Sequence, residues 1–337
     1  MSTPRTRRLV VALGGHAIVP RGAAGTAEEQ TATIRLAMVE VAILVAEGFD
    51  VVVTHGNGPQ VGNLLTKNVL ARRVVPAMPL DWCVAQTQAT IGLAMLTALE
   101  AELAARGIER PIVPVLSRVL VRADDPAWDQ PTKPIGRSVT AEEARAAMAD
   151  DPTEVWRATD PTSAAGWRRI VASPEPVRSL EAATVRMLLE AGAVVVANGG
   201  GGVAMVEDSA GRLVGADAVV DKDLAGALLA VEIEADRLVI LTDVPGVAVD
   251  YGGAGQRWLE TTDPTELRVL AARPTFGVGS MAPKVEAALR FVEATGRPAT
   301  IGPLERAAET LHGRSGTRIV ASRALAEPPT PQAGRAS

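Results

Sequence analysis

The chain has 337 residues, of which 47% are hydrophobic, 22% are charged and 3% are aromatic, and its formal net charge is −5. An acidic chain with few aromatic stacking platforms does not suit a nucleic-acid-binding protein, because phosphate backbones attract a positive field. Its single cysteine, Cys83, allows no intramolecular disulfide, so we expect a cytoplasmic protein. No stretch has the length and apolarity of a membrane span, and we expect no membrane contact.

The first 54 residues predict a strand, a helix and a second strand. Residues 9–13 form a continuous apolar run, which is typical of a strand buried on both faces. Thr26 and Glu29 have the spacing of a helix capping box, and apolar residues then recur at helical spacing until Gly48. Residues 49–54 are again apolar and predict the next strand.

The middle of the chain leaves this rhythm. Helical patterns occur at about residues 60–70 and 82–106, and residues 112–121 are rich in β-formers. Residues 122–178 are rich in proline and hold three of the five tryptophans. We expect this segment to form an inserted, small protruding subdomain or lid.

The strand–helix rhythm resumes after residue 178. It predicts helices at 179–191, 222–230 and 284–295, a helix capped by Asp263 with Pro264 at its first position, and strands at 193–197, 238–241 and 299–302. Residues 326–337 have the composition of a disordered tail. The alternation predicts an α/β fold in one domain, residues 1–325, with a largely parallel sheet covered on both faces.

Glycine-rich breaks follow several of the expected strands. They are Gly14-Gly15, the Gly56-Asn57-Gly58 turn, the glycines of 199–202, and the turn after Thr242-Asp243. Parallel sheets bind ligands beyond the carboxyl ends of their strands, and glycine lets backbone N–H groups approach an anion closely. The breaks together predict an anion-binding site at one edge of the sheet.

Several common signatures are absent from the sequence. It contains no Walker A loop, no His-Arg-Asp kinase loop, no dinucleotide fingerprint and no metal-ligand spacing among its three histidines. Arginine outnumbers lysine by 30 to 4, and three of the four lysines, Lys133, Lys222 and Lys284, lie in Gly-, Pro- or Asp-rich motifs. Lysines of this kind suit phosphoryl transfer, which relies on positioning and on electrostatic stabilisation. Lys67 is interpreted as a solvated surface lysine.

Eight segments resemble the carbamate kinase family, a branch of the amino-acid kinase superfamily, and occur in the family's order. They are residues 12–17, 54–62, 131–136, 166–169, 197–202, 220–225, 240–244 and 279–284. The resemblance implies a three-layer αβα sandwich around a mainly parallel, roughly eight-stranded sheet, and a homodimer. It also implies the reaction ATP plus carbamate giving ADP plus carbamoyl phosphate, with Mg²⁺ bound to ATP and no metal ligand from protein side chains.

The resemblance also implies roles for individual residues. Lys222 contacts the transferred phosphoryl group, Asp223 orients the lysines, Lys284 stabilises the nucleotide phosphates, and Lys133 closes over the substrate. Substrate and phosphoryl contacts are expected from Gly14, Gly15, His16, Gly56, Asn57, Gly58, Arg168, Asn198, Gly199, Gly200 and Gly201. Nucleotide contacts are expected from Thr242, Asp243, Val244, Tyr251, Ser280 and Met281.

Three alternatives remain open. His16 stands where the family usually has Asn, which is compatible with a paralogue that phosphorylates another small acid. Another amino-acid kinase, acting on N-acetylglutamate or aspartate, is the second alternative. The third is a catalytically silent nucleotide- or metabolite-binding protein, which the retention of Lys133, Lys222 and Lys284 disfavours.

Overall fold

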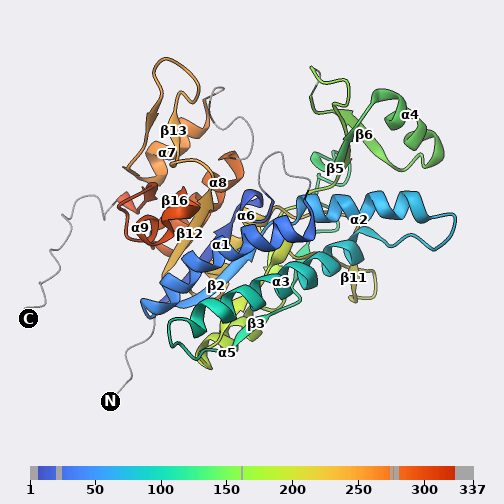
Figure 1. Ribbon diagram of the computed structural model, residues 1–337. Coiled ribbons are helices and arrows are strands. Elements are labelled where there is room, and N and C mark those ends of the chain that lie inside the picture. The colour runs from blue at the N-terminus through green and yellow to red at the C-terminus, as the bar shows by residue number, and fades with distance from the viewer. Residues whose placement is uncertain (1–6, 20–24, 161, 274–275, 277–280, 323–337) are drawn as a thin grey trace, which may run out of the picture.

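The computed structural model of the protein describes residues 7–19, 25–160, 162–273, 276 and 281–322 (Figure 1). The expected tail, residues 326–337, lies outside this part of the chain. Within the described residues, no helix combines the length and apolarity needed to cross a bilayer.

One large sheet organises the described residues. Its eight strands have the order β15-β17-β16-β12-β1-β2-β9-β3, and neighbouring strands are parallel except β16 and β17. The expectation of a mainly parallel, roughly eight-stranded sheet is therefore confirmed. The strands are β1 (Arg8–Leu13), β2 (Asp50–His55), β3 (Ile112–Pro114), β9 (Val194–Val196), β12 (Arg237–Thr242), β15 (Thr261–Thr262), β16 (Ala299–Pro303) and β17 (Thr317–Ile319).

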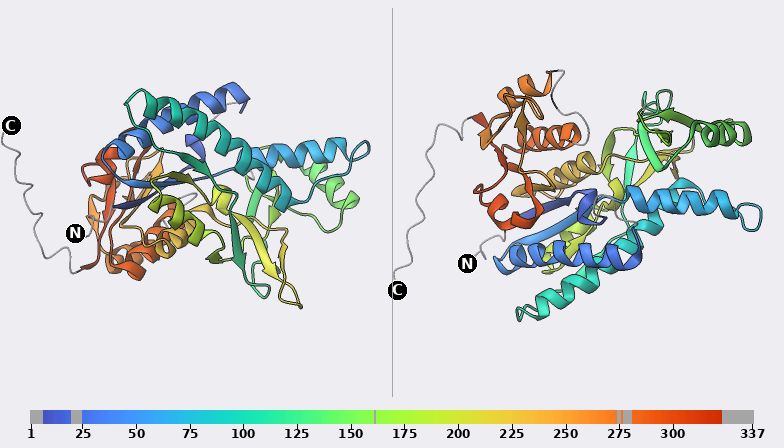
Figure 2. Two further views of the ribbon diagram at one scale, coloured as in Figure 1. Left: turned by 90° about the horizontal axis from the view of Figure 1, so that it is seen from below. Right: turned by 45° about the horizontal axis from the view of Figure 1, so that its top comes forward.

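Helices cover both faces of this sheet, which makes three layers (Figure 2). In β1, Leu9 and Val11 pack into the core formed with α1, α3 and α9, whereas Val10 and Ala12 pack into the core formed with α5, α6, α7 and α8. Successive side chains of a strand point to opposite faces, so a strand between two helical layers must be apolar throughout. The continuous apolar runs of the sequence reflect this arrangement.

The helices begin and end close to the expected residues, except that the helices at 141–150 and 307–311 were not expected. They are α1 (Ala27–Ala46), α2 (Gly58–Ala71), α3 (Leu80–Ala104), α4 (Ala141–Asp150), α5 (Ala182–Glu190), α6 (Lys222–Glu232), α7 (Pro264–Ala271), α8 (Met281–Thr295) and α9 (Ala307–Leu311). The capping box of Thr26 and Glu29 is present, and Asp263 caps α7.

Three smaller sheets lie outside the main one in the described residues, and two of them have three or more strands. The first, β11-β10-β4-β8, contains β4 (Arg118–Val121), β8 (Pro176–Ser179), β10 (Val203–Glu207) and β11 (Leu213–Gly215). The second, β5-β7-β6, contains β5 (Lys133–Val139), β6 (Val155–Ala158) and β7 (Trp167–Val171). Together with α4, the second sheet projects from the body beside α2, and residues 133–171 are called the subdomain below (Figure 1).

Three local expectations differ from the structure. Residues 112–121 form two strands in different sheets, β3 and β4, because the chain leaves the main sheet after Pro114. The helix expected from residue 179 begins at Ala182, because Ser179 still pairs in β8. The β10–β11 hairpin and the short strands β13 (Ala248–Val249) and β14 (Arg257–Trp258) were not expected.

Candidate active site

A cavity of about 760 Å³ opens at the carboxyl ends of the central strands. Gly14 follows β1, Gly56 follows β2 and Thr242 ends β12. The carboxyl ends of these three parallel strands therefore all lie at the cavity. The amino terminus of α6 forms one wall, and the subdomain forms another through Lys133. Such an edge of a parallel sheet is the usual ligand site of α/β folds.

The two buried lysines of the cavity share one carboxylate. Lys222 Nζ lies 2.7 Å from Asp223 Oδ1, and Lys284 Nζ lies 3.1 Å from Asp223 Oδ2. Asp223 and Lys284 are almost fully buried, with exposures of 3% and 4%. Although Asp223 and Lys284 are 61 residues apart in the sequence, the fold brings both ammonium groups to one point of the cavity.

The pKa values of the two lysines move in opposite directions. Burial lowers the pKa of Lys222, but the charge and hydrogen bond of Asp223 outweigh this effect, so the pKa is raised. Burial lowers the pKa of Lys284, repulsion from Lys222 lowers it further, and Asp223 compensates only in part. One carboxylate thus serves two ammonium groups, and a phosphate entering the cavity would be attracted to both.

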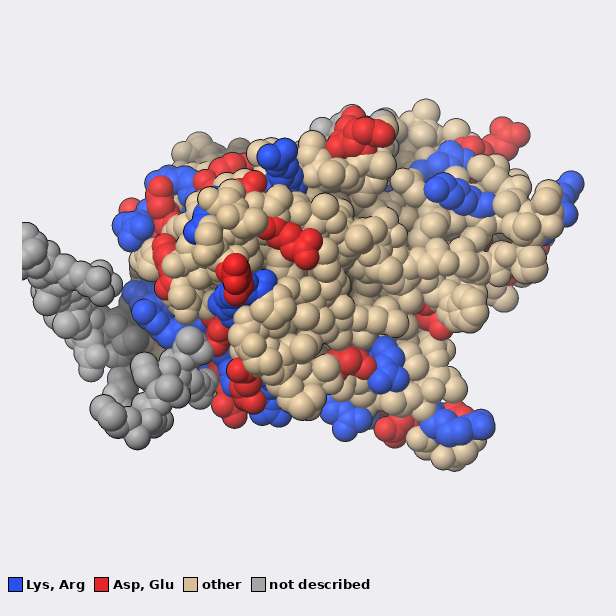
Figure 3. Space-filling model, turned by 60° about the horizontal axis from the view of Figure 1, so that its bottom comes forward, with Lys and Arg blue, Asp and Glu red and all other residues tan. Residues whose placement is uncertain are grey.

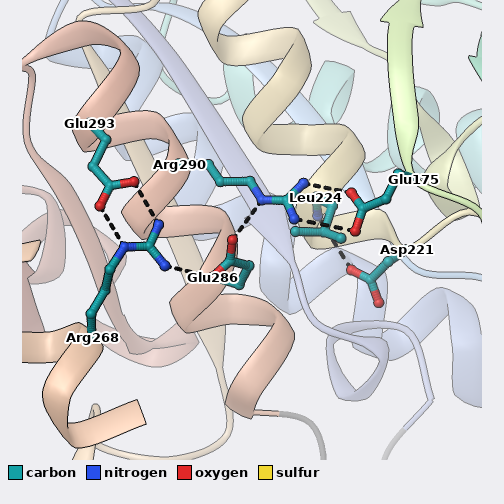
Figure 4. A network of polar contacts seen from close by, with 7 residues as sticks. All are labelled: Glu175, Asp221, Leu224, Arg268, Glu286, Arg290 and Glu293. Carbon is teal, nitrogen blue, oxygen red and sulfur yellow. Dashed lines mark hydrogen bonds and ion pairs between the residues drawn. The ribbon is translucent and has the colours of Figure 1, made fainter. Parts of the chain in front are cut away.

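Asp221 connects the subdomain to the body. Its Oδ1 accepts hydrogen bonds from the backbone N–H groups of Asp223 and Leu224 and so caps α6 (Figure 4). Its Oδ2 accepts from Lys133 Nζ at 2.7 Å. Asp221 therefore both caps α6 and holds Lys133 at the cavity.

Three glycines of the turns leave little room for a side chain. A Cβ atom at Gly56 would lie 3.1 Å from Cδ of Lys222, and one at Gly14 would lie 3.1 Å from the carbonyl oxygen of Leu241. A Cβ atom at Gly200 would lie 2.1 Å from Nδ2 of Asn57. Glycine at these positions therefore allows the backbone to approach the lysine and the cavity closely.

Arg168 brings a second kind of cation to the cavity. Its Nη2 donates to the carbonyl oxygen of Gly136 at 2.9 Å, and its buried Nε has no hydrogen-bond partner among the described residues. Burial lowers the pKa of Arg168. The guanidinium of Arg168 belongs to the cavity lining and is suited to an anion.

Ion pairs hold the outer side of α8, whose first turn reaches the cavity (Figure 4). Arg290 lies 2.7 Å from Glu286 and 2.6 Å from Glu175, which precedes β8. Arg268 of α7 lies 2.6 Å from Glu293 and 3.4 Å from Glu286. The network ties α8 to α7 and to the segment before β8.

Most of the expected site residues line the cavity. They are Gly14, Gly15, Gly56, Asn57, Gly58, Lys133, Arg168, Gly200, Lys222, Asp223, Thr242, Asp243 and Lys284. The cavity also receives residues that the sequence did not single out, among them Asn63, Arg137 and Glu305. Only their position in the fold reveals them, because no motif marks Asn63 or Glu305.

Five further expected residues are described but do not line the cavity, and their roles stay predictions. Asn198, Gly199 and Gly201 are buried, and Val244 and Met281 are half-buried, but none of the five contributes to the cavity lining among the described residues.

Tyr251 is also absent from the cavity lining, and the structure does not describe the side chains of two further expected residues. Tyr251 is 63% exposed and packs edge-on against Trp258, with ring centroids 6.2 Å apart. The backbone of His16 lies in a 3₁₀ turn, Gly15–Ala17, whereas Ser280 lies outside the described residues.

Carboxylates at the cavity do not form a metal site. In the part of the chain that the structure describes, no group of three or more His, Cys, Asp or Glu side chains could hold a metal ion. Asp221 and Asp223 already accept from Lys133, Lys222 and Lys284. The residues present therefore fit a cation carried by a ligand better than a resident metal centre.

A three-layer sandwich with lysines and glycine turns at one sheet edge agrees with the sequence comparison. The chain matches the model of the amino acid kinase family over residues 7–303 and belongs to that family. The carbamate kinase of Thermococcus kodakarensis is 43% identical over 93% of this chain and 99% of its own length. Within the family, the chain therefore belongs to the carbamate kinases.

Two further relatives agree with this placement. The solved structure of carbamate kinase from Giardia lamblia bound to AMP-PNP has a TM-score of 0.87 and 36% identity, and covers 94% of this chain and 99% of its own. The carbamate kinase-like protein YqeA of Escherichia coli is 39% identical over 93% of this chain and 99% of its own length.

Proposed function

We propose that the protein catalyses ATP + carbamate = ADP + carbamoyl phosphate. The observation that carries this proposal is the pair of ammonium groups, Lys222 and Lys284, that one buried carboxylate holds at the cavity. The transition state of phosphoryl transfer spreads negative charge over three equatorial oxygens, and fixed cations stabilise that charge. The carbamate kinases among the relatives share this chain's length and fold.

The transfer is direct. A carboxylate oxygen of carbamate attacks the γ-phosphorus of ATP, a new P–O bond forms, and the bond to the bridging oxygen of ADP breaks. Lys222 contacts the migrating group, Lys284 neutralises the nucleotide phosphates, and Asp223 keeps both ammonium groups in place. Backbone N–H groups of the turns at Gly14–Gly15 and Gly56–Gly58 supply further hydrogen bonds without a covalent intermediate.

The acid end of the cavity lies between two glycine turns. Asn57 and Gly200 approach one another so closely that a side chain at Gly200 would overlap Asn57. A small acid such as carbamate suits this end, and the guanidinium of Arg168, which belongs to the cavity lining, is a candidate partner for its carboxylate or for the phosphoryl oxygens.

Thr242 and Asp243 line the cavity at the end of β12 and are proposed to face the nucleotide. Val244, Tyr251, Ser280 and Met281 are proposed to complete the nucleotide site. Mg²⁺ is proposed to arrive on the phosphates of ATP, where it neutralises charge on the β- and γ-phosphates. The need for ATP is also why we propose a cytoplasmic enzyme.

The segment 122–178 is proposed to act as a lid inserted in a single domain. The contact between Lys133 and Asp221 is one link between its subdomain and the body. Closure would bring Lys133 and Arg168 over the acid and exclude water, which strengthens electrostatic interactions at the site.

A homodimer is proposed through the outer face of α3. Trp82 and Leu93 are 62% and 64% exposed on this helix, and Leu116, beyond the edge strand β3, is 58% exposed. Leu93 and Leu116 line a groove of about 530 Å³ with Ala85 and Ala89. Figure 3 shows that few charged side chains interrupt the middle of this face.

An exposed apolar face of this kind suits a second copy of the chain. In analytical ultracentrifugation, Leu93→Glu should shift the protein towards the monomer. Val269→Glu, at an exposed position of α7, should not. A monomeric unmodified protein would refute the dimer.

The reverse reaction tests the proposed function. ADP, Mg²⁺ and carbamoyl phosphate should yield ATP in a luciferase-coupled assay, whereas acetyl phosphate and N-acetylglutamyl phosphate should yield far less. ATP from another acyl phosphate alone would indicate a paralogue with a different small acid. Binding of ADP without ATP formation from any of them would indicate a silent binding protein.

A further inference from the structure

Buried polar side chains of α3 contact the backs of both glycine turns. Thr87 and Gln88 are 2% and 5% exposed, and they belong to a segment of α3 to which the sequence assigned no role. Each reaches a different turn of the acid site. Adjacent helical side chains point in directions about 100° apart, so two neighbouring residues of one helix can reach two different turns.

Thr87 holds the turn after β2. Its Oγ1 accepts a hydrogen bond of 2.8 Å from Nδ2 of Asn57 and donates one of 2.7 Å to the carbonyl oxygen of Val84. Asn57 stands at the N-cap position of α2, yet its side chain makes no capping hydrogen bond. Its amide is instead committed to Thr87, which sets the direction of a side chain that lines the cavity.

Gln88 holds the turn after β9 through an intermediate residue. Its Nε2 donates to the carbonyl oxygen of Ser117 at 3.0 Å, and its Oε1 accepts from the backbone N–H of Ser117 at 2.8 Å. Ser117 Oγ in turn accepts from the backbone N–H of Asn198 at 2.9 Å. Asn198 has φ +49°, a left-handed conformation that few residues other than glycine adopt, and it starts the 199–202 turn.

The two turns also press on one another. A Cβ atom at Gly199 would lie 3.1 Å from Cγ of Gln88, and one at Gly200 would lie within 2.6 Å of three side-chain atoms of Asn57. A shift of either amide side chain would therefore move the backbone that faces the small acid. Side chains that orient the residues around a reacting group commonly control its geometry in this way.

We propose that Thr87 and Gln88 are positioning residues that set the acid end of the cavity, Thr87 through Asn57 and Gln88 through Ser117 and Asn198. The proposal rests on the proposed function in assigning this end to carbamate. It places specificity for the acid partly in a helix that does not touch the substrate. The nucleotide end, at Thr242 and Asp243, is outside the reach of these hydrogen bonds.

The first test separates the two substrates. Thr87→Val keeps the shape of the side chain but leaves the buried Asn57 amide without its acceptor, so the KM for carbamoyl phosphate should rise about tenfold. The KM for ADP should change less than about twofold, and Thr87→Ser should restore the wild-type value. Thr97→Val is the matched control, because Thr97 makes a similar backbone hydrogen bond on the exposed side of α3.

The second test measures the two turns directly and does not require the protein to be enzymatically active. In hydrogen–deuterium exchange, Thr87→Val should raise exchange in residues 56–58, and Gln88→Leu should raise it in residues 198–202. Equal increases for both KM values, or exchange that rises in neither turn, would overturn the proposal.

Measurements on the unmodified protein distinguish a failure of the proposed function from a failure of the positioning role of Thr87 and Gln88. An unmodified protein that forms no ATP from carbamoyl phosphate would refute the proposed function, while the exchange pattern would still decide whether the positioning is real. Should Thr87→Val fail to fold, Gln88→Leu gives the same comparison of the two KM values through the turn after β9.

Discussion

The body and the subdomain build the same cavity in different ways. In the body, β2 is buried at each of its residues, and Lys222 and Lys284 are fixed by a buried carboxylate. In the subdomain, α4 has one buried residue, Ala144, and β6 is half-exposed. The body therefore has the rigidity that charge stabilisation requires, whereas the outer part of the subdomain is more exposed and only its inner strands pack against the body.

The junction between the two regions contains an apolar cluster, in which Ile135 and Val171 of the subdomain pack with Val61 of α2. Gly62 of α2 lies against Gly136 of β5 so closely that a Cβ atom at Gly62 would be 2.6 Å from the Cα of Gly136. The ion pair between Lys133 and Asp221 is a second link, with the lysine side chain 34% exposed. The body is more buried than the subdomain. This difference would be explained if the body carries out the chemistry and the subdomain closes over the substrate.

The largest effect is expected from Lys222→Ala, in the body. Loss of a fixed cation from the migrating group should lower turnover by about 10²–10³, or about 3–4 kcal/mol in the barrier, while the fold persists. Steady-state ATP formation and thermal melting measure the two quantities. Lys67→Ala, on the exposed side of α2, should keep wild-type turnover. Near-normal turnover of Lys222→Ala would contradict the claim that the body, rather than the subdomain, carries the charge stabilisation.

The burial of the body should also affect how the free energy of unfolding depends on pH in the acid range. His55, at the end of β2, is 1% exposed, and burial lowers its pKa to about 4, although its Nδ1 bonds the carbonyl oxygen of Gly56. In the unfolded chain, the His55 imidazole binds a proton below about pH 6.5. In the folded chain it binds the proton only below about pH 4. The free energy of unfolding should therefore fall by about 3 kcal/mol across that window from this group alone.

Chemical denaturation between pH 7 and pH 4 measures this effect. His55→Gln should flatten the acid dependence by about one proton, because the substituted side chain does not titrate. His312→Gln, which removes a half-exposed imidazole beside Glu47, is the control and should keep the wild-type slope. An unchanged slope in His55→Gln would mean that His55 is solvated and that the sheet edge is open.

A smaller effect is expected in the subdomain. Lys133→Ala removes one half-exposed charge that Asp221 holds, so kcat/KM for carbamoyl phosphate should fall about tenfold with no change in stability. Arg145→Ala, an exposed position of α4, should have no effect. If Lys133→Ala lost as much turnover as Lys222→Ala, the two regions would share the chemistry equally.

The smallest effect is expected at the surface network of α8. Arg290→Gln breaks the contacts with Glu175 and Glu286, which are partly exposed. Exposed ion pairs contribute little, so the free energy of unfolding should change by about 1 kcal/mol or less, and less in high salt. Denaturation with and without added salt provides the measurement. A large loss of turnover would show that this network positions the catalytic end of α8.

The layers of the fold could be predicted because apolar runs and caps are local signals. The strand at β1, the cap at Thr26 and the Pro264 helix start are each encoded within a few residues. The β10–β11 hairpin was not predictable, because β11 is fully exposed and lacks the apolar alternation of a core strand.

The candidate site could be predicted only in part, because its motifs mark residues but not their partners. Lys222 was recognisable next to Asp223. By contrast, Lys133 and Asp221 are 88 residues apart, and Asn57 and Thr87 are 30 apart. Such pairs depend on the packing of α3, α6 and β5, which no local pattern specifies.

A double-mutant cycle of Asp223→Asn and Lys222→Ala tests the central claim most directly, because that claim is that Asp223 acts through the lysines it holds. Asp223→Asn keeps the side-chain shape and removes the shared charge. We expect each single variant to lose turnover severely and the double variant to lose scarcely more than the worse single variant. Losses that multiply in the double variant would contradict the account, since the carboxylate and the ammonium group would then act independently.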